Sequence, residues 1–308
     1  MSDGVGGIWG LPIALVGGAL RVSAPYLFVS LGECLTEKSG RINLGQEGTL
    51  IMGAMSGYGV SYLSGSPWLG VLAAGCVGVV LGAAHAWLCS LPRVNDVAVG
   101  IALMLFGTGL AFFLGKPLIQ PKAPRLSSFE LGAWSSSAPV RAALEINGLF
   151  LVGVAAAFAM RFVFQRTRWG LVVRIVGEDA DAARALGYDV NRVRFAATAV
   201  GGFFAGVGGS FLSLYYPGSW SEGLSSGQGL MAVALVIFAR WDPVRCLLAS
   251  LLFGGAGAIG PALQSIGILG GYNLYATAPY VLTFVIMIAT SSARRTLAGQ
   301  PAELTVAR

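Results

Sequence analysis

Charged residues are scarce in this chain. They account for 11% of its 308 residues, whereas soluble globular domains carry roughly 25%. Hydrophobic residues reach 55% and the mean hydropathy is +0.73, so an ordinary soluble domain is excluded. The first apolar segment has no basic n-region and runs beyond the length of a signal-peptide h-region, so we do not expect a cleavable signal. The composition predicts a multi-pass membrane protein.

Residues that carry catalysis or bind metals are also few. Histidine occurs once, as His85 inside an apolar run, where we interpret it as a core residue and not as a ligand. The chain has neither the G-x-x-x-x-G-K-[ST] phosphate loop nor the H-E-x-x-H zinc motif. The cysteines lack metal-ligand spacing, so we expect small buried hydrophobes at Cys34, Cys76, Cys89 and Cys246. We therefore expect a chain that is not an enzyme and that binds no cofactor or metal itself.

Lysine is rare as well, and the net charge of +6 comes almost entirely from arginine. A nucleic-acid partner is not expected, because no basic patch is interleaved with aromatic residues. Arginine instead indicates which loops face the cytoplasm. It gathers in the 166–194 loop and in the tail, at Arg166, Arg168, Arg174, Arg184, Arg192, Arg194, Arg294 and Arg295. Both segments are therefore predicted to be cytoplasmic, which places the 116–145 loop in the periplasm and leaves the side of the N-terminus open.

Glycine, by contrast, is abundant, at 45 residues. Small residues let membrane helices approach closely, because lipid offers no hydrophobic drive for their association. Nine apolar runs approach the length of about 20 residues that spans a bilayer; they lie near 8–32, 46–64, 68–91, 96–115, 146–165, 195–216, 228–240, 243–266 and 272–291. We predict one all-α polytopic membrane domain, 1–308, with about 8–10 transmembrane or re-entrant helices in two pseudo-repeated halves. Tyr215, Tyr216 and Trp220 are expected to anchor the extracytoplasmic interface.

Two of these runs are interrupted. The run at 228–240 is short, and the run beginning at Gly48 follows the polar, glycine-rich stretch SGRINLGQEG. Irregular backbone at membrane depth is tolerated only where it is buried in protein or lines a cavity, so the two breaks predict a pathway. The segments 44–54 and 225–235 share a polar entry, a glycine-flanked glutamine and an apolar helix. Opposed repeats of this kind are a common transporter plan, although chance also produces such matches in a glycine-rich chain.

The first break holds the sharpest candidate residue, Glu47. An ionisable group at membrane depth is costly and is by default a functional-site hypothesis. A structural alternative is that Glu47 caps its own helix, with Arg41 or Arg21 as its charge partner. The neutral side chains near the breaks suit a weak contact with a polar heterocycle or a sugar; they are Asn43, Gln46 and Gln228. We predict that these residues and Glu47 line the translocation pathway.

The interval 174–194 concentrates charge between two apolar blocks. Glu178, Asp179 and Asp181 suit a helix N-terminus, where the macrodipole favours acids. Gly187 suits the C′ position that ends a helix. The pattern predicts a short amphipathic helix over 178–186 that docks a soluble partner; a solvated turn without a partner is the alternative.

Three segments resemble one family of permeases. VGEDADAARALGYDVNRVRF (176–195) resembles the cytoplasmic coupling segment of ABC importer permeases in the branched-chain amino acid, ribose and nucleoside group. The segments 30–54 and 201–254 agree with it, and INLGQEG (42–48) is similar to the family's INLG-x-EG motif. Together they look most like nucleoside-type permeases that work with a basic-membrane-lipoprotein binding protein. The resemblance covers 20–290.

The resemblance implies partners. They are a second, related permease chain in a heterodimer, cytoplasmic ATPase subunits that carry the ATP and Mg²⁺, an extracytoplasmic substrate-binding protein, and membrane lipid. It also implies that the coupling segment sits in a groove of the ATPase, through Gly177, Glu178, Asp179, Ala182, Ala183, Arg184 and Gly187.

The sequence therefore predicts the transmembrane permease subunit of an ATP-driven importer in the bacterial inner membrane, with purine nucleosides or a related heterocycle as substrate. A riboflavin-like molecule, a sugar or an amino acid is the alternative cargo. An ion-coupled secondary transporter is the alternative mechanism. Its cue would be paired carboxylates within the spans, but Glu33, Glu47 and Asp96 are scattered in the sequence.

Overall fold

The computed structural model describes residues 10–134, 140–141, 144–265, 270, 272–275, 277–289 and 299–305. Across these residues the chain is all-α apart from one short hairpin, as predicted for a polytopic membrane protein. The helices are α1 (Gly10–Lys38), α2 (Gln46–Ser64), α3 (Pro67–Cys89), α4 (Asp96–Gly115), α6 (Gly148–Arg166), α7 (Arg168–Glu178), α8 (Ala180–Ala185), α9 (Val190–Leu214), α10 (Gln228–Phe238), α11 (Pro243–Ser265), α12 (Tyr272–Tyr275) and α13 (Ala278–Ala289). Short 3-10 turns form η1 (Lys116–Leu118) and η2 (Ala302–Thr305), and the strands are β1 (Ser128–Glu130) and β2 (Glu145–Asn147).

Most helices follow the predicted apolar runs. Among the described residues, six are long and apolar enough to cross a membrane, namely α1, α3, α4, α6, α9 and α11. The two interrupted runs become α2 and α10, which begin at Gln46 and Gln228 as predicted. Three boundaries differ most. Helix α1 continues past the predicted end at residue 32 to Lys38, α9 begins at Val190 and not at residue 195, and the run at 272–291 divides into α12 and α13.

Helix α9 forms the centre of the bundle, packed against α1, α2 and α3. Its glycines allow direct backbone contact: a Cβ built on Gly202 would lie 2.1 Å from the carbonyl oxygen of Gly78 in α3. On the side of α2, a Cβ on Gly209 would lie 1.9 Å from the carbonyl oxygen of Leu50. A methyl group at either position would force the helices apart. The abundance of glycine thus serves close helix packing, as the composition predicts.

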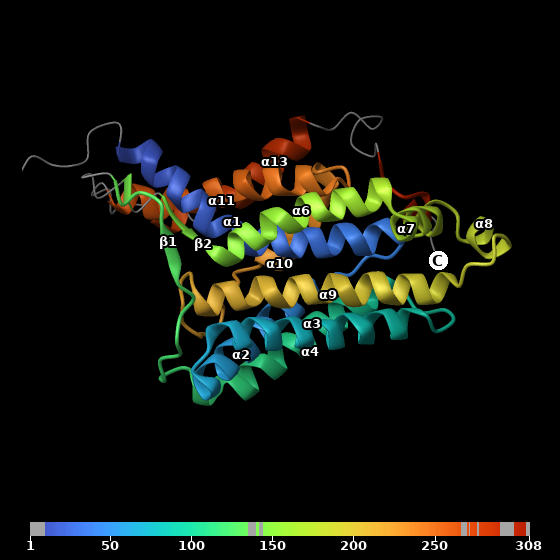
Figure 1. Ribbon diagram of the computed structural model, residues 1–308, viewed down its shortest axis with the longest axis horizontal. Helices are drawn as coiled ribbons and strands as arrows, with labels where there is room; N and C mark the ends of the chain where they lie inside the picture. Colours follow the sequence, from blue (N-terminus) through green and yellow to red (C-terminus); the bar gives the residue numbers. More distant parts are fainter. Residues whose placement is uncertain are drawn as a thin grey trace, which may run out of the picture.

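The bundle has two distinct ends (Figure 1). At one end, called here the hairpin end, β1 pairs antiparallel with β2. Arg21 of α1 holds this hairpin through an ion pair with Glu145, at 3.1 Å, and Asn147 caps α6 by accepting the N–H of Leu149 at 2.8 Å. At the other end, called here the α8 end, α7 and α8 project beyond the long helices.

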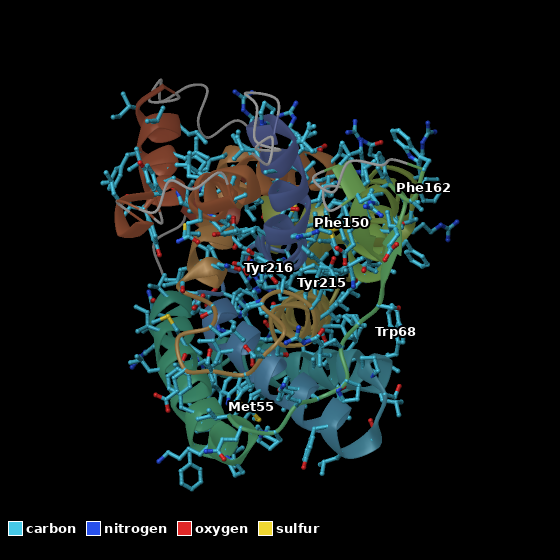
Figure 2. The ribbon with its side chains drawn as sticks, turned by 90° about the vertical axis from the view of Figure 1, so that its left-hand side faces the viewer. Met55, Trp68, Phe150, Phe162, Tyr215 and Tyr216 are labelled. Atoms are coloured by element: carbon cyan, nitrogen blue, oxygen red, sulfur yellow. The ribbon has the colours of Figure 1, made fainter. Side chains whose placement is uncertain are left out.

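Viewed from the hairpin end, the labelled aromatic side chains lie both at the perimeter of the bundle and nearer its centre, where Tyr215 and Tyr216 are found (Figure 2). Trp68 and Phe162 lie at this perimeter and are 48% and 62% exposed, as suits contact with lipid. The expected interface anchor Trp220 is instead buried under α4, where a Cβ on Gly115 would lie 2.4 Å from its indole nitrogen. The predicted burial of the cysteines also fails at Cys76, which is exposed on α3.

Candidate functional site

The two interrupted helices meet at their N-termini. Glu47 lies in the first turn of α2 and is only 7% exposed. Its carboxylate accepts four hydrogen bonds from the start of α10: from the hydroxyl of Ser225 at 2.5 Å, and from the N–H groups of Gly227 at 3.2 Å, Gly229 at 2.6 Å and Leu230 at 3.3 Å. The approach requires glycine, because a Cβ on Gly229 would lie 2.6 Å from the Cα of Glu47. Glu47 thus pairs the unsatisfied N–H groups of α10 and complements its dipole.

This role of Glu47 differs from both structural alternatives in the sequence analysis. Glu47 caps a helix, but the helix is α10 and not its own. Neither arginine is its charge partner, since Arg41 pairs with Asp96 at 2.6 Å and Arg21 pairs with Glu145 at 3.1 Å. The hydrogen-bond donors of Glu47 lie 178 to 183 residues further along the chain.

The two helices leave this junction in opposite directions. Helix α2 runs to the hairpin end, where Tyr58 and Ser61 donate to carbonyl oxygens of the 116–145 segment. Helix α10 runs to the α8 end, where Trp241, just beyond it, donates to Glu37 near the end of α1. Two helices that start close together and diverge match the opposed arrangement that the sequence similarity of 44–54 and 225–235 predicts.

A second buried carboxylate lies beside the junction. Glu33 of α1 is fully buried and accepts hydrogen bonds from the N–H of Asn43 at 2.7 Å and from the side-chain amide of Gln46 at 2.8 Å. The side-chain oxygen of Asn43 in turn accepts the N–H of Gly45 at 2.9 Å. Three predicted pathway residues therefore belong to one polar cluster: Asn43 and Gln46 bind Glu33, and Glu47 directly follows Gln46.

Two side-chain amide oxygens lie near the junction, that of Gln46 in this cluster and that of Gln228 at the start of α10. Both are buried, and neither has a hydrogen-bond partner among the described residues. Gln228 is the first residue of α10 and lies within the stretch 225–230 whose N–H and O–H groups bind Glu47. The junction therefore presents neutral acceptors, while its two carboxylates are already paired with N–H and O–H donors.

Two further candidate residues, Glu33 and Glu37, do not stand out in the sequence. Glu33 is one of three acids that are far apart in the sequence, and Glu37 lies beyond the predicted end of the first helix. They lie one turn apart on α1, and both are buried. The predicted end of the first helix at residue 32 places them in a loop. The available signal is their four-residue spacing, with apolar Cys34 and Leu35 between them, which continues the helical periodicity to Lys38.

Residues 168–185 form two helices, α7 and α8, and not the single helix predicted over 178–186. Glu178 ends α7, and the extended backbone of Asp179 separates it from α8. The side chain of Asp179 caps α8 by accepting the N–H groups of Asp181 at 2.9 Å and Ala182 at 2.8 Å. The earlier helix, α7, continues through Glu178, with apolar residues at Leu171, Val172, Val173, Ile175 and Val176, so α8 begins two residues later than predicted.

The end of α8 agrees with the prediction. Gly187 has a φ of +86°, the left-handed conformation that favours glycine at C′. Its N–H donates to the backbone carbonyl oxygen of Arg184 at 2.9 Å, and the N–H of Tyr188 donates to the carbonyl oxygen of Ala183 at 3.0 Å. These two bonds form a Schellman motif.

The predicted ATPase contacts separate into an inner and an outer set. Gly177 and Ala183 face inward: a Cβ on Gly177 would lie 2.2 Å from the carbonyl oxygen of Lys38, and Ala183 packs with Val176 and Val190. They position the corner but offer no side chain to a partner. The exposed residues, which form what we call the outer face of the corner, are Glu178, Asp179, Asp181, Ala182, Arg184 and Gly187.

Known proteins are similar in sequence to this chain over most of its length. The family described as branched-chain amino acid transport system, permease component, matches residues 15–291. The putative glucose ABC transporter permease protein TsgC13 of Haloferax volcanii is 34% identical over 82% of the chain and 79% of its own length. The nucleoside ABC transporter permease protein NupC of Lactococcus lactis is 29% identical over 89% of the chain and 90% of its own length. The guanosine ABC transporter permease protein NupQ of Bacillus subtilis is 28% identical over the same shares.

These relatives occur in pairs. Lactococcus lactis also has NupB and Bacillus subtilis has NupP, permeases with the same descriptions that are each 23% identical to the chain. The resemblance to nucleoside-type permeases and the multi-pass location in the bacterial plasma membrane are thereby confirmed. The chain belongs to the family of branched-chain amino acid transport system permease components.

Proposed function

We propose that this chain is the transmembrane permease subunit of an ATP-driven ABC importer for nucleosides, purine nucleosides in particular. The observation that carries the proposal is its similarity to a nucleoside and a guanosine permease over 90% of the length of each. A sugar is the second candidate cargo, favoured by the 34% identity to the putative glucose permease.

The chemistry of the α2–α10 junction supports an uncharged, polar cargo. Glu33 and Glu47 are occupied by donors from the chain itself, so they offer little to a cationic substrate. The open acceptors are the amide oxygens of Gln46 and Gln228. Such oxygens accept hydrogen bonds from ring N–H, amino or hydroxyl groups, which nucleosides and sugars both carry.

The outer face of the α7–α8 corner is, in this proposal, the docking site for a cytoplasmic ATPase subunit. ATP and Mg²⁺ are held by that subunit, since this chain has no phosphate loop. The 116–145 segment at the hairpin end then faces the extracytoplasmic binding protein. A second, related permease completes the pathway in a heterodimer, as the paired relatives NupB with NupC and NupP with NupQ suggest.

The test is transport by the complete importer in proteoliposomes, with guanosine and glucose offered separately. We expect ATP-dependent uptake of guanosine and stimulation of ATP hydrolysis by it. Uptake of glucose alone would move the assignment to the sugar candidate. Uptake by this chain without its ATPase would support an ion-coupled transporter instead.

The coupling assignment has its own test in Glu178→Lys and Gly187→Val. Both are expected to abolish substrate-stimulated ATP hydrolysis while membrane insertion persists. Glu178 is exposed on the outer face, and a side chain at Gly187 meets no atom within 4 Å but strains the end of α8, because the φ of Gly187 is +86°. Glu178→Gln is the matched control, since it keeps size and polarity. Normal stimulation in both test variants would overturn the coupling role.

A further inference from the structure

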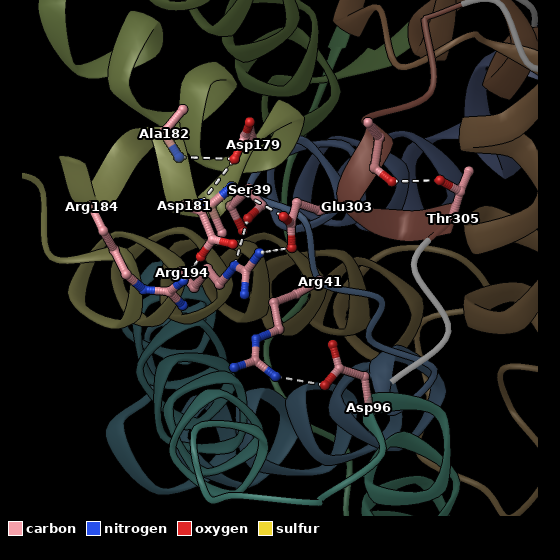
Figure 3. Close-up of polar contacts among 12 residues, drawn as sticks. Ser39, Arg41, Asp96, Asp179, Asp181, Ala182, Arg184, Arg194, Glu303 and Thr305 are labelled. Atoms are coloured by element: carbon pink, nitrogen blue, oxygen red, sulfur yellow. Dashed lines mark hydrogen bonds and ion pairs between the residues drawn. The ribbon is translucent and has the colours of Figure 1, made fainter. Parts of the chain in front are cut away.

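The C-terminal segment 299–305 is packed onto the α7–α8 corner (Figure 3). One carboxylate oxygen of Glu303, in η2, accepts the N–H of Ala180, the first residue of α8, at 3.0 Å. The other oxygen pairs with the guanidinium of Arg194 at 2.9 Å. The backbone carbonyl of Gly299 accepts the ammonium of Lys38 at 3.0 Å. Glu303 therefore connects α8 directly to α9.

Arg194 extends this connection to the start of the polar cluster. Its side chain is 2% exposed, and its Nε donates to the carbonyl oxygen of Ser39 at 3.0 Å. Ser39 follows the last residue of α1 and lies four residues before Asn43, which binds Glu33. The buried guanidinium of Arg194 thus contacts two segments. One is the segment 299–305, which binds α8 through Glu303, and the other is the connection from α1 to α2, which leads into the α2–α10 junction.

Two glycines keep these segments in direct contact. A Cβ on Gly40 would lie 2.9 Å from Nη2 of Arg194 and 2.9 Å from Cβ of Glu303, and the φ of Gly40 is +83°. A Cβ on Gly177 would lie 2.2 Å from the carbonyl oxygen of Lys38. The end of α7, the end of α1 and the tail therefore meet without intervening side chains. Such a joint transmits displacement, because packed interiors are not easily compressed.

We propose that Glu303 and Arg194 form a positioning pair, which makes the α7–α8 corner and the α1–α2 connection move together. A displacement of α8 is thereby passed to Ser39 and onward to the polar cluster at Glu33 and Gln46. The inference rests on the proposed function, because it takes the ATPase to act on the outer face of the corner.

The variants separate the two bonds of Glu303. Glu303→Gln keeps an oxygen for the N–H of Ala180 but loses the ion pair, and Glu303→Ala loses both. The exchanged double variant Arg194→Glu with Glu303→Arg allows an ion pair with reversed charges but loses the bonds to Ser39 and Ala180. A carboxylate at 194 cannot donate to the Ser39 carbonyl oxygen, and a guanidinium at 303 cannot accept the N–H of Ala180. Thr305→Val is the matched control, since the hydrogen bond that the Thr305 hydroxyl makes within the described part of the chain stays inside η2, at 2.6 Å to Ala302.

The measurement is substrate imported per ATP hydrolysed by the complete importer in proteoliposomes, together with the amount of ATPase bound. We expect Glu303→Gln to lower this ratio by about 2- to 30-fold, the range that coupling residues typically show, with ATPase binding unchanged. Glu303→Ala and the exchanged pair are each expected to lower it at least as much, because both lose the contact with Ala180, and Thr305→Val is expected to match the unaltered chain.

A merely structural role would reduce the amount of assembled importer and leave the ratio unchanged. A normal ratio of substrate imported to ATP hydrolysed in assembled Glu303→Gln overturns the proposal. If Glu303→Gln does not assemble, a normal ratio in assembled Glu303→Ala overturns it. Loss of assembly in every Glu303 variant overturns it as well. These outcomes leave the docking role of α8 standing. Loss of the docking role instead shows as normal stimulation of ATP hydrolysis in Glu178→Lys.

Discussion

The α2–α10 junction and the α7–α8 corner use the same device over different sequence distances. In both, a carboxylate accepts N–H groups at the start of a short helix. At the corner, Asp179 is exposed and its partners lie two and three residues away. At the junction, Glu47 is buried and its partners lie 178 to 183 residues away. The first cap shapes one helix, whereas the second also joins the two halves of the chain.

The difference has energetic consequences. An exposed cap contributes about 1 kcal/mol to its helix, because water replaces the lost bond when the side chain is removed. A buried cap cannot be replaced in this way, and each donor left unsatisfied costs about 1–3 kcal/mol. Substitutions at the junction should therefore affect the whole bundle, and substitutions at the corner should stay local.

The largest effect is expected for Glu47→Ala. It leaves four donors without their acceptor, two of them in buried bonds and two in partly buried ones. We therefore expect the importer to lose about 3–5 kcal/mol of stability and its transport activity. Thermal unfolding of the detergent-solubilised importer measures the first, and guanosine uptake the second. Glu47→Gln keeps one acceptor oxygen, so its stability and its guanosine uptake should lie between those of Glu47→Ala and the unaltered chain. Equal stability of Glu47→Ala and the unaltered chain would remove the distinction between buried and exposed caps.

An intermediate effect is expected for Gly229→Ala. The added methyl group would lie 2.6 Å from the Cα of Glu47, so α10 must retreat from its cap, at about 1–3 kcal/mol as for other overpacked sites. Gly109→Ala in α4 is the matched control, because nothing lies within 4 Å of its Cβ position. The same thermal measurement should show a loss for the first variant and none for the second. Equal behaviour would mean that the close approach of α2 and α10 is not needed.

The smallest effect is expected for Asp179→Ala. It removes the cap of α8 and should cost about 1 kcal/mol locally, without lowering the unfolding temperature of the bundle. Hydrogen exchange of the α8 amides measures this loss, which should be faster exchange at Asp181 and Ala182 alone. Asp179→Ser retains a capping oxygen and should restore protection. A fall in bundle stability equal to that of Gly229→Ala would show that the corner is not a local unit.

Much of the architecture follows from the sequence because its causes are local. The apolar runs predict the long helices, α2 begins at Gln46, and Gly187 ends α8 as its position after the helix indicates. The start of α8 is misplaced because acids suit either side of a helix boundary. Glu178 therefore passes for a first-turn residue, although it is the last residue of α7.

The candidate site is predictable only in part. Asn43, Gln46, Glu47 and Gln228 stand out as polar residues at breaks in apolar runs, and the structure brings the first three into one cluster beside the start of α10. The partner of Glu47 is not predictable, since nothing near it in the sequence points to α10. The role of Glu303 is not predictable for the same reason, because its hydrogen-bond donors Ala180 and Arg194 lie 123 and 109 residues away in the sequence.

The sequence by itself determined that this chain spans a membrane, where its interrupted helices begin, and that the charged segment 174–194 lies between apolar blocks. Composition and local periodicity suffice for these, since each depends on neighbouring residues. Only the tertiary structure decided which carboxylate caps which helix and which segments touch Arg194. Those choices depend on glycines such as Gly229 and Gly40, which let distant backbones approach until one side chain can bind both.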